Sequence, residues 1–146
     1  ELNVISEFIE PDMVLEKIST TPDYIIDAID SITPKVTFIK SAVEHKLPIV
    51  SSMGAGAKLD PTQLKVVDIS KTWNCPFAQQ VRKLLKKQGI YKGIKVVFSP
   101  EDPDKNSLML TDGSRFKKSS YGTISYLPAV FGAVAASVVI RDLISQ

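Results

Sequence analysis

The chain has 146 residues, of which 44% are hydrophobic and 23% are charged, a composition typical of a soluble globular domain with one core. Its net charge of +2 excludes a function that depends on a strongly charged chain as a whole. The single cysteine, Cys75, excludes an internal disulfide and a multi-cysteine zinc site, and it favours a reducing, cytoplasmic location. We expect a single domain over residues 1–146.

The first segment, Asn3–Ile9, predicts a strand, and residues 11–18 predict a helix because Pro11 suits a first helical position. The N-terminus lacks the basic and apolar regions of a signal peptide, and it begins at Glu1 rather than at methionine. We therefore expect a chain cut from a longer protein and a fold that is incomplete at its N-terminus.

Residues 23–29 (DYIIDAI) form a continuous apolar run that is typical of a central parallel strand. A helix over residues 33–46 follows, with Thr33 as its cap. Its inward face consists of Val36, Phe38, Ile39, Ala42 and Val43. Residues 47–54 predict the next strand. The alternation of strands and helices indicates a Rossmann-like α/β fold with three layers, helices covering both faces of the sheet.

The second half predicts strands over residues 63–70 and 94–99, separated by a helix over residues 76–89. The turn before residue 63 is too short for a crossover helix, so we expect antiparallel pairing there and a mixed sheet overall. The helix would turn Phe77, Val81, Leu84 and Leu85 inward and end at Gly89.

The last part of the chain combines a polar segment with an apolar one. Residues 101–122 predict a long loop, and residues 124–144 predict a C-terminal helix. The apolar part of that helix is shorter than the roughly 20 residues that span a bilayer. Its Gly and Ala content favours close packing against the sheet or a partner subunit, so we expect no membrane association.

Two carboxylates, Asp27 and Asp30, stand where the strand of residues 23–29 ends. Ligands of parallel α/β sheets bind beyond the carboxyl ends of the strands, and hard cations prefer oxygen ligands. One reading is therefore that the pair holds Mg²⁺ or positions phosphates. The other is that Asp27 ends the strand and Asp30 orders the turn. Asp30 lies further out and is the better candidate for a ligand.

Residues 51–60 (SSMGAGAKLD) carry Gly54 and Gly56 but have Leu59 where a third glycine of the G-x-G-x-x-G phosphate fingerprint would stand. We expect a closely packed turn that lines the substrate side of a cleft rather than a dinucleotide loop.

Basic residues recur in two segments. They are Arg82, Lys83, Lys86 and Lys87 on the predicted helix, and Arg115, Lys117 and Lys118 in the predicted loop. Both sets have the composition of an RNA-binding surface, and equally that of a solvated helix face and of a mobile loop. Neither Cys75 nor the only histidine, His45, has the surroundings of a nucleophile or general base, so a Ser-His-Asp triad is not expected.

Three motifs together resemble the ubiquitin-activating-enzyme-like adenylating family, the ThiF/MoeB/HesA group. They are D-A-I-D-S-x-x-P-K at residues 27–35, P-I-V-x-x-x-G-A-G at 48–56, and D-P-T-Q followed by V-x-D and K-T at 60–72. The C-terminal FGAVAASVVIRDLI is similar to the branch that dehydrates tRNA threonylcarbamoyladenosine.

The resemblance implies a domain that uses ATP and Mg²⁺ to adenylate a carboxylate, here that of the threonylcarbamoyl group on adenosine 37 of tRNA, before ring closure. Asp30 matches the aspartate that binds Mg²⁺ and ATP, and Ser31 and Lys35 match neighbouring cofactor-binding positions. It further implies a homodimer, tRNA contacts through the basic residues, and sulfur-transfer or sulfur-acceptor proteins as partners.

The family's glycine-rich phosphate loop is absent from these residues, so we expect the chain alone to be inactive. The family's paired CxxC zinc motifs are absent too, which argues against a ThiF- or MoeB-type activator. Two alternatives stay open: adenylation of a ubiquitin-like sulfur-carrier protein, and a non-catalytic α/β interaction module.

Overall fold

The computed structural model describes residues 1–10, 12–14, 22–104, 108–110 and 119–145. Its main helices are α2 (Ile32–Glu44), α3 (Pro76–Lys87) and α4 (Tyr126–Ile144). Its strands are β1 (Ile25–Asp27), β2 (Ile49–Ser52), β3 (Lys65–Asp68), β4 (Lys95–Phe98), β5 (Leu108–Leu110) and β6 (Ser119–Tyr121). Two single turns of 3₁₀ helix, η1 (Pro61–Gln63) and η2 (Ile69–Lys71), flank β3.

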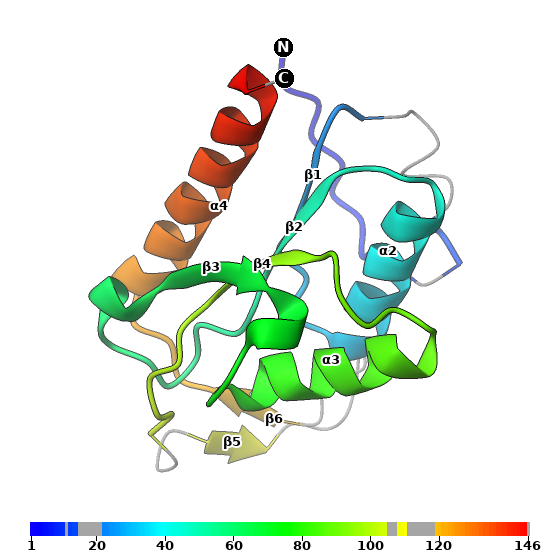
Figure 1. The fold of residues 1–146 in the computed structure, drawn as a ribbon. Coiled ribbons are helices and arrows are strands. Elements are labelled where there is room, and N and C mark those ends of the chain that lie inside the picture. The colour runs from blue at the N-terminus through cyan, green and yellow to red at the C-terminus, as the bar shows by residue number, and fades with distance from the viewer. Residues whose placement is uncertain (11, 15–21, 105–107, 111–118, 146) are drawn as a thin grey trace.

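Four strands of the described chain form a mixed sheet in the order β1-β2-β4-β3. The first three run parallel, and β3 is antiparallel to β4 at the edge, which confirms the mixed sheet. The short turn before β3 does reverse the chain, but β3 is not the neighbour of β2. The crossover through α3 returns the chain so that β4 lies between them (Figure 1).

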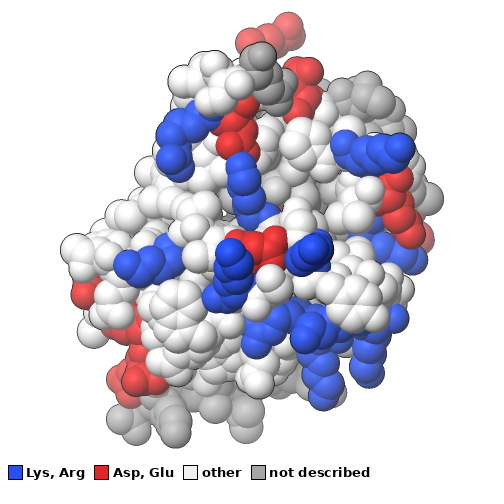
Figure 2. Space-filling view, viewed as in Figure 1, with Lys and Arg blue, Asp and Glu red and all other residues white. Residues whose placement is uncertain are grey.

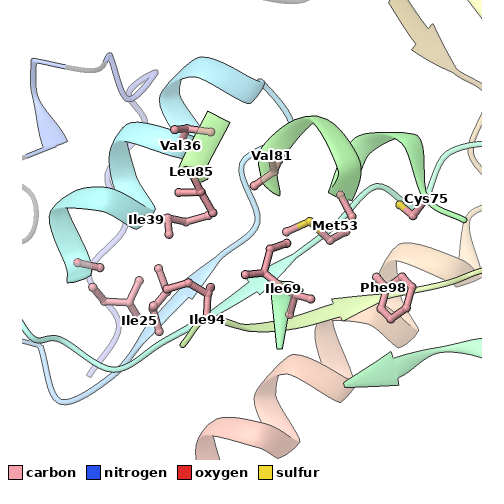
Figure 3. Close-up of a cluster of buried hydrophobic side chains, with 14 of the residues drawn as sticks. Ile25, Val36, Ile39, Met53, Ile69, Cys75, Val81, Leu85, Ile94 and Phe98 are labelled. Atoms are coloured by element: carbon pink, nitrogen blue, oxygen red, sulfur yellow. The ribbon is translucent and has the colours of Figure 1, made fainter. Parts of the chain in front are cut away.

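Helices cover both faces of this sheet: α2 and α3 lie on one side and α4 on the other (Figure 1). Side chains alternate between the faces along each strand, so Val96 and Phe98 pack with α2 and α3, whereas Val97 packs with α4. Figure 3 shows the larger cluster, in which residues of α2 and α3 meet those of the strands. The predicted three-layer, Rossmann-like arrangement is confirmed.

Helix α3 follows its sequence pattern closely. Val81 and Leu85 are buried, and Phe77 and Leu84 are partly buried against the same core. The helix ends in a Schellman motif, because Ile90 N–H donates to Leu85 O and Gly89 N–H to Lys86 O. Gly89 has a φ of 79°, which a residue with a Cβ adopts only with strain.

Helix α2 differs from its prediction at both ends. It begins at Ile32 with Ser31 as N-cap, so Thr33 lies inside the first turn and does not cap it. Val43 is 37% exposed rather than inward, because the buried stripe of the helix continues from Ile39 to Ala42. His45 is the C-cap, as its position near the helix end suggested.

Three further expectations differ from the structure. Asn3–Ile9 forms no strand, and the predicted helix of residues 11–18 falls mostly outside the described residues. The predicted central strand, β1, is an edge strand of the described sheet, and its Ile26 is 47% exposed. The segment of residues 101–122 contains β5 and β6, which pair antiparallel in a small second sheet.

Helix α4 packs on the sheet through one stripe only. Leu127, Phe131, Ala135 and Val138 are buried, while Ile140 and Ile144 are exposed. The Asp142 carboxylate fixes the C-terminal end by accepting hydrogen bonds from Tyr24 Oη (2.7 Å) and from Lys95 Nζ (2.5 Å).

Length and composition alone would also allow α4 to cross a membrane, and 22% of it is buried in the structure. A single helix of this kind is weak evidence for a membrane protein, because the core helices of soluble proteins meet the same criteria. The expected close packing against the sheet is met along one stripe of the helix.

Candidate functional site

The carboxyl ends of the parallel strands β1 and β2 bring two polar residues side by side. Asp27 ends β1 and is aligned with Ser51 of β2 in the sheet register. Both side chains lie on the face covered by α2 and α3, and both are fully buried. Ligands of parallel α/β sheets bind at the carboxyl ends of the strands, so the polar pair marks the candidate site.

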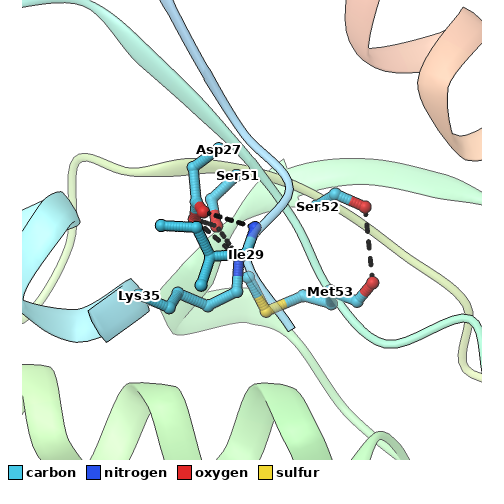
Figure 4. Close-up of polar contacts among 6 residues, drawn as sticks. All are labelled: Asp27, Ile29, Lys35, Ser51, Ser52 and Met53. Atoms are coloured by element: carbon cyan, nitrogen blue, oxygen red, sulfur yellow. Dashed lines mark hydrogen bonds and ion pairs between the residues drawn. The ribbon is translucent and has the colours of Figure 1, made fainter. Parts of the chain in front are cut away.

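Lys35 of α2 joins this pair from above the sheet. Its Nζ lies 2.6 Å from Asp27 Oδ2 and 3.2 Å from Ser51 Oγ, and Ser51 Oγ donates to the same Asp27 oxygen at 2.5 Å (Figure 4). The second oxygen, Oδ1, accepts the backbone N–H of Ile29 at 2.9 Å. Asp27 therefore connects strand, helix and the turn that leads to Asp30.

The Lys35 ammonium is 0% exposed, and it also lies 5.9 Å from the centre of the Phe77 ring of α3. Burial lowers the pKa of Lys35, while the charge and hydrogen bond of Asp27 and the charge of Asp30 act in the opposite direction. A buried lysine with a short contact to a carboxylate is held in place by that contact. Its predicted role in binding a cofactor stays a prediction.

Asp30 lies beyond the strand end and is exposed, unlike Asp27. It follows the Asp27-ordered turn and directly precedes Ser31, the N-cap of α2. Its charge reaches Lys35, as the effect on the lysine pKa shows. Of the two carboxylates, the structure thus leaves Asp30 on the outside, where a ligand could meet it, and gives Asp27 a structural position.

The glycine-bearing turn after β2 is packed tightly against the segment around β6. A Cβ on Gly56 would lie 2.7 Å from Cβ of Tyr121, and the neighbouring Ala57 N–H donates to Gly122 O at 2.8 Å. Gly54 lies beside Phe77, where an added Cβ would stand at 3.4 Å. The expectation of a closely packed turn is met, while its role toward a substrate stays a prediction.

A second buried lysine, Lys58, was not singled out from the sequence. Its Nζ donates to the backbone oxygens of Ser99 and Glu101, beyond the end of β4. Burial lowers the pKa of Lys58, and nearby Cys75 and acidic residues oppose that effect. The Glu101 carboxylate in turn accepts the N–H groups of Leu59 and Asp60. Because the partners are about 40 residues apart, no local pattern could have indicated this clamp.

The predicted basic residues of α3 have different surroundings. Arg82 is half-buried, and its Nη1 donates to the carbonyl and hydroxyl oxygens of Thr72. Lys83, Lys86 and Lys87 are exposed on the outer face. Arg115, Lys117 and Lys118 lie outside the described residues.

Cys75 and His45 lie at helix ends, near the start of α3 and the end of α2. Cys75 is buried as the N-cap of α3, and His45 Nδ1 donates to the carbonyl of Ser41 at the end of α2. Among the described residues, no group of three or more His, Cys, Asp or Glu side chains could hold a metal by itself.

Comparison with known proteins decides the family. The family model described as ThiF matches residues 1–146, which is the whole chain. The chain belongs to the ThiF family. The resemblance inferred from the motifs at residues 27–35, 48–56 and 60–72 is confirmed.

Similar members of the family carry one functional name. The chain is 38% identical over 131 residues to a tRNA threonylcarbamoyladenosine dehydratase of Bacillus subtilis, a match that covers 85% of this chain and 52% of that protein. It is also similar to the solved structure of the Escherichia coli enzyme of that name in complex with ATP, with a TM-score of 0.80 and 32% identity. The same enzyme in complex with AMP gives a TM-score of 0.79 and 33% identity.

These structural matches cover 97% of this chain but only 56% of the Escherichia coli chain. The chain thus spans little more than half the length of the relatives to which it is compared.

Proposed function

We propose that this chain forms part of an ATP-dependent tRNA threonylcarbamoyladenosine dehydratase. The observation that carries the proposal is the fold match over nearly the whole chain to an enzyme of that name in complex with ATP. The exposed carboxylate of Asp30, beyond the carboxyl end of β1, supports the proposal, since nucleotides bind at this end of parallel sheets.

In the proposed reaction, a carboxylate oxygen of the threonylcarbamoyl group on adenosine 37 attacks the α-phosphorus of ATP, and pyrophosphate leaves. A nucleophilic atom of the carbamoyl part of the same group then attacks the activated carbonyl carbon and gives up a proton to solvent, and AMP departs with the bonding electrons as the ring closes. The balance is loss of water from the substrate and conversion of ATP to AMP and pyrophosphate.

In this reaction we assign to Asp30 the role of Mg²⁺ ligand, and to Asp27 the role of ordering the turn that leads to Asp30. A single carboxylate suits Mg²⁺, which typically takes one or two protein carboxylates and fills its other positions with phosphate oxygens and water. Mg²⁺ would neutralise charge on the departing pyrophosphate. Ser31, which caps α2 beside Asp30, would face the same ligand.

Lys35 contributes indirectly in this account. Because its ammonium is buried against Asp27 and Ser51, it orders the turn of residues 27–30 rather than touching the nucleotide.

We propose that Gly54 and Gly56 are part of the turn that faces the substrate. We further propose a cytoplasmic homodimer, in which the exposed apolar residues of α4 contribute to the interface.

The test uses the full-length natural protein that contains these residues. It measures AMP formation from ATP with threonylcarbamoylated tRNA. Asp30→Ala removes the proposed metal ligand and should lower the rate on the order of a hundredfold. Asp23→Ala, an exposed aspartate before β1, is the matched control and should leave the rate within about twofold. An Asp30→Ala enzyme as fast as the control would remove Asp30 from the metal site.

A further inference from the structure

Charge is distributed very unevenly along this chain. Residues 61–100 contain eight lysines and arginines but a single acidic residue, Asp68, which gives this segment a net charge of +7. The remainder of the chain therefore carries −5, although the whole carries only +2. Figure 2 shows basic side chains gathered over the region that α3 occupies in Figure 1.

Five lysines make up what we name the α3 basic surface. They are Lys71 of η2, Lys83, Lys86 and Lys87 of α3, and Lys92 after the helix, and all five are exposed. None forms an ion pair with a carboxylate of the described residues. Against the effect of burial, hydrogen bonds from Ser70 and Gly93 lower the pKa of Asp68, and nearby Lys71 adds to this without forming an ion pair.

This arrangement is not explained by the stability of α3. Lys83 stands three and four residues before Lys86 and Lys87, so the like charges face each other along the helix and destabilise it. The helix dipole favours the two lysines of the last turn but offers nothing to Lys83. A solvated helix usually intersperses acidic residues, and α3 has none.

The surface begins close to the candidate site. Phe77, in the first turn of α3, lies next to the Lys35 ammonium. At about 1.5 Å per residue, Lys83 stands roughly 9 Å further along the axis and Lys87 roughly 15 Å. A polyanion that reached the site could therefore follow the outer face of α3.

We propose that the α3 basic surface binds backbone phosphates of the tRNA whose modified adenosine enters the candidate site. The proposal rests on the proposed function for the identity of the RNA. Arg82 is not part of this surface, because its guanidinium joins α3 to Thr72. Tyr91 is 62% exposed beside Lys92 and offers a ring on which a base could stack.

The test measures binding of a fluorescein-labelled tRNA transcript by anisotropy at several salt concentrations, with the longest natural chain. Lys83→Gln, Lys86→Gln and Lys87→Gln are combined in one variant. Each lost phosphate contact removes about 0.7–0.9 from the slope of log affinity against log salt. We expect the slope to fall by about 2 and affinity at 100 mM salt to fall about tenfold or more.

A triple variant with the same change in charge serves as control: Lys40→Gln, Lys46→Gln and Arg141→Gln, all outside residues 61–100. It should change the slope by less than about 0.5, and thermal unfolding of both variants verifies folding. Equal losses in the two variants, or an unchanged slope in the α3 variant, would overturn the proposed surface.

The outcomes also separate this surface from the proposed function. If the wild-type protein turns over tRNA but the α3 variant binds RNA as tightly as wild type, the proposed surface is wrong and the proposed function stands. If the wild-type protein binds RNA through these lysines but forms no AMP, the proposed function is wrong and the RNA-binding surface is kept.

Discussion

Asp27 and Asp30 have opposite surroundings although only three residues separate them. Asp27 is 1% exposed and bound by Lys35, Ser51 and the Ile29 N–H, whereas Asp30 is exposed at the start of α2. The pattern of the sequence placed both at the ligand edge and favoured Asp30 as the outer one. It could not show that Lys35 pairs with Asp27, because that contact joins a helix to a strand and depends on how they pack.

The buried pair gives a prediction at this scale. Lys35→Met would leave the Asp27 charge buried without its cation and lower the free energy of unfolding by about 3–5 kcal/mol. The double variant Asp27→Asn, Lys35→Met removes both charges, so we expect it to recover part of that loss. Urea denaturation measures both.

Lys40→Met is the control for the loss of one lysine. It breaks an exposed pair with Glu44, 3.6 Å apart, which should cost no more than about 0.5 kcal/mol. If Lys35→Met proved as mild as Lys40→Met, the pair would not hold the turn before Asp30.

At the scale of elements, local signals explain why some predictions held. Gly89 and the apolar spacing fixed α3 and its end, since the Schellman motif needs only neighbouring residues. The strand β4 was found as a segment, yet its place between β2 and β3 was not. That place depends on the crossover through α3 and not on the short turn before β3. The strands β5 and β6 lie in a polar segment without a strand pattern, so the sequence indicated a loop.

The turn after β2 gives a prediction for an element. Gly56→Ala would place a Cβ 2.7 Å from Tyr121 Cβ and push the turn away from the segment that accepts the Ala57 N–H. We expect it to lower the free energy of unfolding by about 1–3 kcal/mol, because close-packed sites tolerate added atoms poorly.

Gly132→Ala in α4 is the matched change, since nothing lies within 4 Å of its added Cβ. Alanine favours a helix over glycine by about 1 kcal/mol, so this variant should be as stable as wild type or more so. Equal stability of the two variants in urea denaturation would show that the turn is not tightly packed.

At the scale of the whole molecule, β1 is the edge strand of the described sheet, and one face of α4 is exposed. Ile26 on β1 and Ile140 on α4 are both more than 40% exposed. The periodicity of the apolar residues predicted the α/β class, whereas the expected single core is two apolar clusters, one on each face of the sheet. Which surfaces stay open could not be predicted, because that depends on how the elements are arranged.

We propose that the protein containing this chain activates a carboxylate on tRNA. The most direct measurement is AMP formation from radiolabelled ATP by the longest natural chain, supplied with threonylcarbamoylated tRNA or with a ubiquitin-like sulfur-carrier protein. We expect AMP formation with the modified tRNA, matched by loss of one water from the nucleoside in mass spectra, and no AMP above background with the carrier. An adenylated carrier with unchanged tRNA would contradict it.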